Sequence, residues 1–248
     1  MLLIRVTFFV CNIRVMKNIA LLIILASSTV LNPYETYKKE DLLGDIKAAK
    51  HKSFVKLKAQ HSTKTNAYLR SEVYEAFQKM YDAAKKDGVS LIIISATRNR
   101  AYQSGIWNRK WNSFGGDENT RANRILQYSS MPGTSRHHWG TDFDLNDLEN
   151  SYFESGTGLK VYNWLQNHAH KYGFFQPYTK FNPYRDAGYR EEKWHWSYFP
   201  LASKFQRAYT HIINYSDLGG FNGSQYAEKL DVINNYVNGI EVAEKVKD

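Results

Sequence analysis

Residues 135–145 read SRHHWGTDFDL, a stretch that holds two histidines, two aspartates and a glycine. Its end, TDFDL, alternates polar and apolar residues as a half-buried strand does. On a strand, Asp142 and Asp144 face the same side, because successive side chains point to opposite faces. His137 precedes them across Gly140, where a small residue allows a tight turn. One histidine and one aspartate of this stretch could therefore converge on a metal ion.

A second polar cluster lies at residues 191–199, EEKWHWSYF, and its end also alternates like a strand. Glu192 precedes His195 by three residues, a pair that can supply a general base and a metal ligand, with Glu191 as the alternative base. Zinc in a hydrolytic site usually takes three protein ligands and leaves a fourth position for water. Histidine and carboxylate must supply these ligands here, because the only cysteine is Cys11.

The residues around these clusters predict one α+β domain without repeats or low-complexity linkers. Residues 68–87 place apolar side chains at steps of three and four, as an amphipathic helix does. Residues 89–96, VSLIIISA, form a short β-branched run typical of a buried strand. The other expected elements are helices from residue 101, over 159–173 and in the tail after 203, strands over 141–145, 173–178 and 193–199, and a loop over 115–135.

The beginning of the chain predicts a secretory signal peptide over residues 1–28, with residues 1–15 as an upstream extension. It has a basic, acid-free start, an apolar run over 19–26 and small residues after it. The apolar run is shorter than the roughly 20 residues that span a bilayer, although an uncleaved anchor is the alternative. We expect a secreted or periplasmic monomer with no stable membrane insertion after signal removal. Such a chain would have no disulfide, because Cys11 lies in the leader.

The net charge of +9 suits an anionic polymer such as a cell wall or a nucleic acid. However, the chain has no run of five or more basic residues. We therefore do not expect a nucleic-acid partner.

The two polar clusters together resemble a known family. The spacing Ser-x-His-x-x-Gly-x-x-x-Asp from Ser135 to Asp144, followed by Glu-x-Trp-His from Glu192 to His195, is similar to VanY-type D-alanyl-D-alanine carboxypeptidases. These belong to the zinc peptidases that include lysostaphin-type enzymes and the hedgehog domain. Upstream, the segment from Ser95 to Arg98 is similar to the family's Ser-x-x-Arg motif. The resemblance covers roughly residues 65–200.

The resemblance implies a small central antiparallel sheet that carries the zinc site and is flanked by helices. It implies that Zn²⁺ is held by His137, Asp144 and His195. Glu192 would be the general base, taking a proton from zinc-bound water and passing it to the leaving amine. Arg98 would grip the carbonyl or the terminal carboxylate of the substrate. The other implied substrate-binding or supporting residues are Gln103, Ser135, Asp142, Trp194 and Tyr198.

Asp142 departs from the family, which often has a small residue at this position. Its carboxylate could be a partner of a ligand histidine, a contact for a substrate amine, or a rival of Asp144 as ligand. Arg100 is a rival of Arg98, and His138 is expected to be structural or exposed to solvent.

We expect an N-terminal extension over residues 29–64, a catalytic domain over 65–202 and a helical tail over 203–248 that packs on the same domain. The implied reaction is hydrolysis of the terminal D-alanine from peptidoglycan stem peptides. The alternatives are an L,D-carboxypeptidase, an endopeptidase of peptidoglycan cross-links, or a catalytically inactive cell-wall-binding module. Glu192 favours an enzyme, because a binding module needs no general base.

Overall fold

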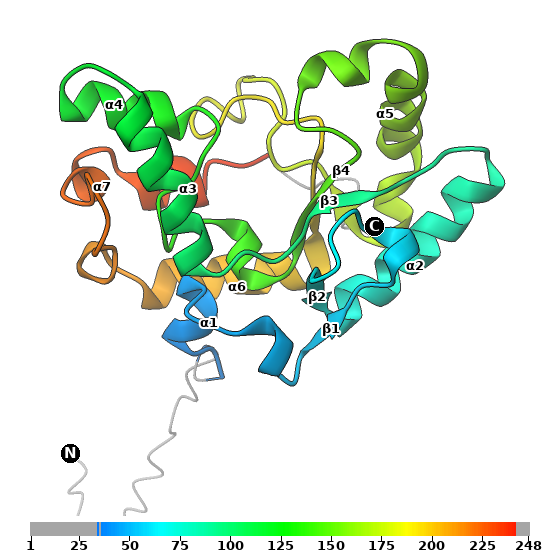
Figure 1. Cartoon of the computed structure of the whole chain (residues 1–248), viewed down its shortest axis with the longest axis horizontal. Coiled ribbons are helices and arrows are strands. Elements are labelled where there is room, and N and C mark those ends of the chain that lie inside the picture. The colour runs from blue at the N-terminus through cyan, green and yellow to red at the C-terminus, as the bar shows by residue number, and fades with distance from the viewer. Residues whose placement is uncertain (1–33, 35, 242–248) are drawn as a thin grey trace, which may run out of the picture. The chain divides into compact units, whose positions relative to one another are not determined.

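The computed structural model describes residues 34 and 36–241, so the predicted signal peptide lies outside the described residues. Helices lie on both sides of a small sheet, and this confirms the expected α+β class (Figure 1). The helices are α1 Lys39–Leu43, α2 Ser71–Lys86, α3 Arg100–Ser113, α4 Glu118–Leu126, α5 Gly156–His168, α6 Phe199–Ile212 and α7 Tyr226–Lys229. The strands are β1 Phe54–Lys56, β2 Tyr68–Arg70, β3 Ile93–Ser95, β4 Asp142–Leu145, β5 Phe174–Phe175 and β6 His195–Tyr198.

The main sheet is antiparallel and has the strand order β3-β4-β6-β5. In its centre, the register of β4 and β6 pairs Asp144 with His195 and Phe143 with Trp196. Strands β1 and β2 form a separate antiparallel pair. The β4–β6 register therefore brings the two polar clusters of the sequence together.

One face of the central strands is apolar and faces a core shared with α2 and α5. Phe143 and Trp196 belong to this core, and the Phe143 ring lies 5.3 Å from that of Phe77 and 5.1 Å from that of Phe174. Because side chains alternate along a strand, Asp144 and His195 are turned to the opposite face. The alternation of side chains along the strands thus places the hydrophobic core on one face of the sheet and the polar cluster on the other.

A second core lies beside α3 and α6 and includes the C-terminal tail. Trp139, which ends the 3₁₀ turn Arg136–Trp139, stacks on Phe205 at 6.1 Å between ring centroids. The Tyr209 hydroxyl donates a hydrogen bond to the Gly133 carbonyl at 2.9 Å. The tail after β6 therefore packs against the chain just before the site.

Helices α2 and α4 differ from the sequence-based expectation. Helix α2 begins at Ser71 rather than at residue 68, because residues 68–70 pair with β1 as strand β2. Helix α4 lies where a loop was expected. The Asp117 side chain caps it by accepting a hydrogen bond from the Thr120 backbone N–H, and its buried residues Ala122, Ile125 and Leu126 share one face.

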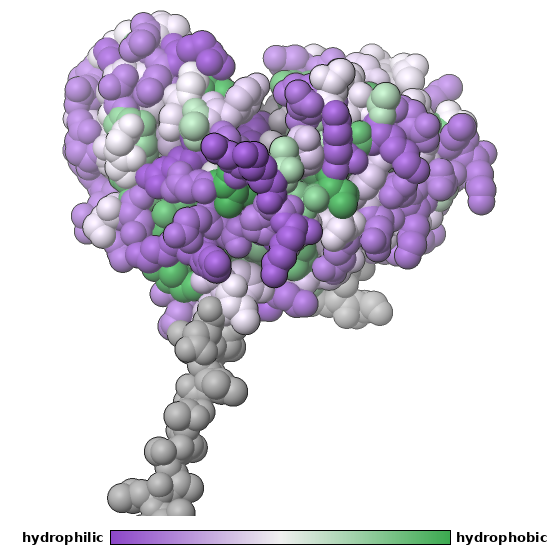
Figure 2. All heavy atoms as spheres, turned by 60° about the horizontal axis from the view of Figure 1, so that its bottom comes forward, coloured by the Kyte–Doolittle hydropathy of each residue, from purple (hydrophilic) through white to green (hydrophobic). Residues whose placement is uncertain are grey.

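Hydrophilic residues predominate on the face shown in Figure 2, where hydrophobic residues form only small separate groups. The large apolar side chains are instead gathered in the two cores. Within the described part of the chain, no helix has the length and apolar character needed to cross a membrane.

Phe143→Ala tests the packing that supports the central strand. The ring is fully buried between two other rings, so its removal should lower the free energy of unfolding by about 3–5 kcal/mol. Phe181→Ala is the matched control, because that ring is 53% exposed and should cost less than about 1 kcal/mol. Urea denaturation measures both. Equal losses for the two variants would contradict the described core.

Candidate active site

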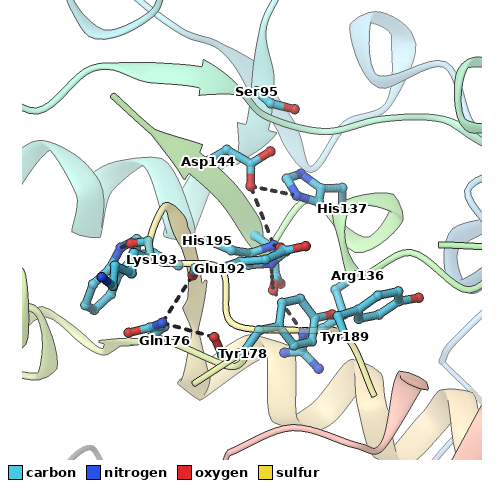
Figure 3. A network of polar contacts seen from close by, with 12 residues as sticks. Ser95, Arg136, His137, Asp144, Gln176, Tyr178, Tyr189, Glu192, Lys193 and His195 are labelled. Atoms are coloured by element: carbon cyan, nitrogen blue, oxygen red, sulfur yellow. Dashed lines mark hydrogen bonds and ion pairs between the residues drawn. The ribbon is translucent and has the colours of Figure 1, made fainter. Parts of the chain in front are cut away.

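Three side chains that can bind a metal converge where the 3₁₀ turn Arg136–Trp139 meets β4 and β6. The Oδ1 atom of Asp144 lies 3.3 Å from Nε2 of His137 and 3.5 Å from Nδ1 of His195. Figure 3 shows the Asp144 carboxylate between the two histidine side chains. All three residues are buried, at most 3% exposed.

These atoms fit a zinc ion in number and type, and the two distances from Asp144 fit its geometry. Two ligands about 2.0–2.1 Å from a tetrahedral ion lie roughly 3.3–3.4 Å apart, close to the two distances that Asp144 makes. His137 Nε2 and Asp144 Oδ1 are buried and have no hydrogen-bond partner among the described residues. Buried polar atoms without partners are costly, so a cation between them would satisfy both. The donor set therefore matches a catalytic zinc site with three protein ligands.

Hydrogen bonding prepares His137 to act as a neutral ligand. Its Nδ1–H donates to the Ala96 carbonyl at 2.8 Å, which leaves the Nε2 lone pair directed to the site. Burial and the nearby Arg98 guanidinium lower the pKa of His137, although Asp144 opposes this shift. The imidazole is therefore neutral at pH 7, the form that binds a metal.

Arg98 lies at the edge of the same cluster. Its Nη1 donates to Ser95 Oγ at 3.0 Å and to Asp144 Oδ2 at 3.4 Å. Burial opposes ionisation of Asp144, but nearby cationic groups, including the Arg98 guanidinium, outweigh it and hold the pKa of Asp144 below its ordinary value. The rival, Arg100, is elsewhere: it pairs with Asp45 and donates to two backbone carbonyls.

Glu192 lies beside His195, with 3.2 Å between Oε2 and Nδ1 (Figure 3). Its backbone N–H donates to the Tyr178 carbonyl at 2.9 Å, and Gln176 Nε2 donates to its carbonyl at 3.2 Å. Burial raises the pKa of the Glu192 carboxyl, although the hydrogen bond to His195 opposes this shift. A carboxylate with a raised pKa is suited to accept and return a proton.

These residues open into a cavity of about 700 Å³. The alternative base, Glu191, does not line this cavity, whereas Glu192 does. The expected site residues that line it are Arg98, Gln103, Ser135, His137, Asp144, Glu192, Trp194 and His195.

Two expected substrate contacts, Tyr198 and Asp142, do not line the cavity. Tyr198 is an odd number of residues from His195, so the strand turns it to the apolar face, where its ring lies 5.3 Å from Phe174. Asp142 is fully buried, with Oδ1 3.0 Å from Nε2 of His195. The structure thus places Asp142 behind a metal-site histidine rather than in the cavity.

His138 is structural, as expected, and it supports Arg98. Its Nδ1–H donates to the Arg98 carbonyl at 2.6 Å, and its Nε2 accepts from the Gly133 N–H at 3.1 Å. Burial lowers the pKa of His138 to about 3, so the ring stays neutral and keeps both bonds at pH 7.

Lys110 and Tyr178 also line the cavity but were not expected from the sequence. Lys110 lies seven residues after Gln103 on α3, two helical turns along the same face, and this spacing could have identified it. Tyr178 packs edge-on against His195, with 4.7 Å between ring centroids. It lies in a loop, where the periodicity of the sequence does not indicate which way a side chain points.

Residues 66–201 match the family described as VanY, D-alanyl-D-alanine carboxypeptidase. The chain is 32% identical over 133 residues to the putative carboxypeptidase YodJ of Bacillus subtilis (strain 168), covering 53% of this chain and 46% of the relative. It is 31% identical over 125 residues to a D-alanyl-D-alanine carboxypeptidase of Enterococcus faecalis (strain ATCC 700802 / V583), covering 49% and 44%. The matches thus span less than half the length of these curated relatives.

The fold is similar to that of the LD-carboxypeptidase LdcB, with a TM-score of 0.51 and 22% identity over 73% of this chain and 79% of that chain. A structure of VanYB in complex with D-alanine-D-alanine gives a TM-score of 0.49 and 21% identity, covering 74% of this chain and 92% of that chain. At these identities, the similarity to LdcB concerns the fold alone.

His137→Ala tests the metal centre. Removal of one of three ligands should weaken zinc binding by at least about 100-fold, as measured by competition with a chromogenic chelator. His211→Ala is the matched control, because that histidine is exposed on α6 and should leave affinity unchanged. An unchanged affinity in His137→Ala, together with a loss in His138→Ala, would show that the ligand assignment is wrong.

Proposed function

The chain belongs to the VanY D-alanyl-D-alanine carboxypeptidase family, and we propose that it is a zinc peptidase that removes the terminal D-alanine from peptidoglycan stem peptides. The observation that carries the proposal is a buried Glu192 carboxylate next to a three-donor metal set in one cavity. A module that only binds cell wall would have no use for this carboxylate.

The three proposed ligand atoms are His137 Nε2, Asp144 Oδ1 and His195 Nδ1, because Asp144 Oδ1 faces both histidine nitrogens. Zinc bound there would supply Lewis-acid polarisation of the scissile carbonyl and make water more acidic. Glu192 takes a proton as the water oxygen attacks the carbonyl carbon. It then delivers this proton to the leaving amine nitrogen as the C–N bond breaks, which restores the Glu192 carboxylate.

Arg98 is proposed to hydrogen-bond the oxygen of the scissile carbonyl. Its contacts with Ser95 and Asp144 hold the guanidinium next to the metal set, where this oxygen must lie. Negative charge develops on this oxygen during attack, and a fixed cation stabilises it. The terminal carboxylate of the substrate lies one residue beyond the scissile bond. It therefore needs a partner other than Arg98.

We assign that role to Lys110. Lys110 lines the same cavity, and its side chain has no ion pair within the described part of the chain. Burial lowers the pKa of Lys110, whereas the nearby Glu192 raises it. The buried Ser135 hydroxyl, which has no partner in the described residues, lines the cavity and can donate a further hydrogen bond. A carboxylate anchor of this kind favours a carboxypeptidase over an endopeptidase.

The proposed substrate lies in the cell wall, so we propose a secreted or periplasmic protein that acts as a monomer and binds no nucleic acid. An L,D-carboxypeptidase and a cross-link endopeptidase remain the alternatives, since both use the same hydrolytic chemistry.

Glu192→Gln tests the proposed mechanism. The amide cannot accept the proton, so kcat should fall by about 100- to 10,000-fold on a muropeptide that ends in D-Ala-D-Ala. Zinc content should stay near one ion per chain, because Glu192 is not a proposed ligand. Mass spectrometry of the products identifies the bond from the mass lost. Full activity of the variant would refute the mechanism, and loss of a fragment other than D-alanine would refute the substrate.

Lys110→Ala tests the carboxylate anchor. Loss of the ammonium should raise KM by about tenfold for a peptide with a free terminal carboxylate, with little change in kcat. The neighbouring Arg109→Ala is the control, because Arg109 is exposed on α3 and does not line the cavity. If Lys110→Ala leaves KM unchanged, the carboxylate binds elsewhere.

A further inference from the structure

Asp142 is a fully buried carboxylate that lies two residues from the proposed ligand Asp144. An isolated buried charge is costly, and two nearby carboxylates disfavour each other's ionisation. Nevertheless, both oxygens of Asp142 have hydrogen-bond partners, and one of these partners is a guanidinium. The contacts around Asp142 thus compensate a buried carboxylate.

Arg136 provides the compensating charge and is itself 1% exposed. Its Nε donates to Asp142 Oδ1 at 2.9 Å, and its Nη2 donates to Ser197 Oγ at 2.8 Å. Its guanidinium also lies 4.9 Å from the centre of the Trp139 ring. Thr141 Oγ1 donates to the other oxygen of Asp142. The pair thus joins the turn before β4 to strand β6.

The same carboxylate reaches the far side of His195. Asp142 Oδ1 lies 3.0 Å from Nε2, whereas Nδ1 faces Glu192 Oε2 at 3.2 Å and Asp144 Oδ1 at 3.5 Å. A neutral imidazole carries one N–H. A carboxylate at Nε2 draws the proton to that nitrogen and leaves the Nδ1 lone pair for a metal.

We propose that the Arg136–Asp142 pair is a positioning device that holds His195 in the tautomer and orientation required for metal binding through Nδ1. This proposal rests on the proposed zinc site but not on the identity of the peptide substrate. A role as a rival ligand does not fit, because Asp142 approaches the nitrogen that points away from Asp144 and Glu192. A substrate contact does not fit either, because the carboxylate is fully buried and does not line the cavity.

The test measures zinc affinity in the absence of substrate. Asp142→Ala should weaken zinc binding by about 10- to 100-fold, as expected for loss of a partner of a ligand histidine. It also leaves the Arg136 charge buried and unpaired, so its stability should fall. Asp82→Ala, an exposed aspartate on α2, is the control and should change neither property.

The double variant Arg136→Met/Asp142→Ala separates positioning from folding. Removal of both buried charges should restore much of the stability that the single variant loses. Zinc affinity should stay 10- to 100-fold below that of the wild type, because nothing holds the Nε2 proton of His195. Wild-type zinc affinity in the stable double variant would overturn the proposal.

Asp142→Asn keeps the shape of the side chain if the other variants fail to fold. Its affinity should fall in the same direction, because the neutral amide holds the Nε2 proton less strongly, and an unchanged affinity would overturn the proposal. Wild-type protein that binds zinc but leaves a D-Ala-D-Ala peptide intact would contradict the proposed function alone, since the affinity measurements need no substrate.

Discussion

The alternation of side chains along two paired strands is the constraint on which the rest of this structure depends. In β4, Phe143 faces the core while Asp142 and Asp144 face the site. In β6, Trp196 joins the same core and leaves His195 beside Asp144. A shift of one residue in the register would put the acids into the hydrophobic core and the rings into the cavity. Packing of the apolar face therefore sets the geometry of the polar face.

The site buries several charged side chains in a small volume, and each buried aspartate is paired with an arginine. Arg98 lies against Asp144, and Arg136 lies against Asp142. His195 is in contact with three carboxylates, those of Asp142, Asp144 and Glu192. Only two buried atoms in the metal-binding set, on His137 and Asp144, lack hydrogen-bond partners among the residues described. The space between these two atoms is therefore suited to a cation.

The chemistry and the specificity of the site come from different parts of the fold. The proposed ligands and base lie on the turn before β4, on β4, in the segment just before β6 and at its first residue, and both strands pack on the core. Other residues that line the cavity, including Lys110 and Tyr178, come from α3 and from loops. Loops tolerate change more readily than strands do. The family membership accordingly supports the proposed hydrolytic centre more strongly than the choice of peptide.

The sequence by itself determined the α+β class, the central strands and the family, because residue period and motif spacing are local properties. It also placed His137, Asp144, Glu192 and His195 in two short segments. Only the tertiary structure decided that Tyr198 packs against Phe174 and that Asp142 lies behind His195, since register is set by packing between distant segments. Helix α4 and the β1–β2 pair escaped prediction for a related reason: one is mostly polar, and the other is short and stabilised by a partner strand.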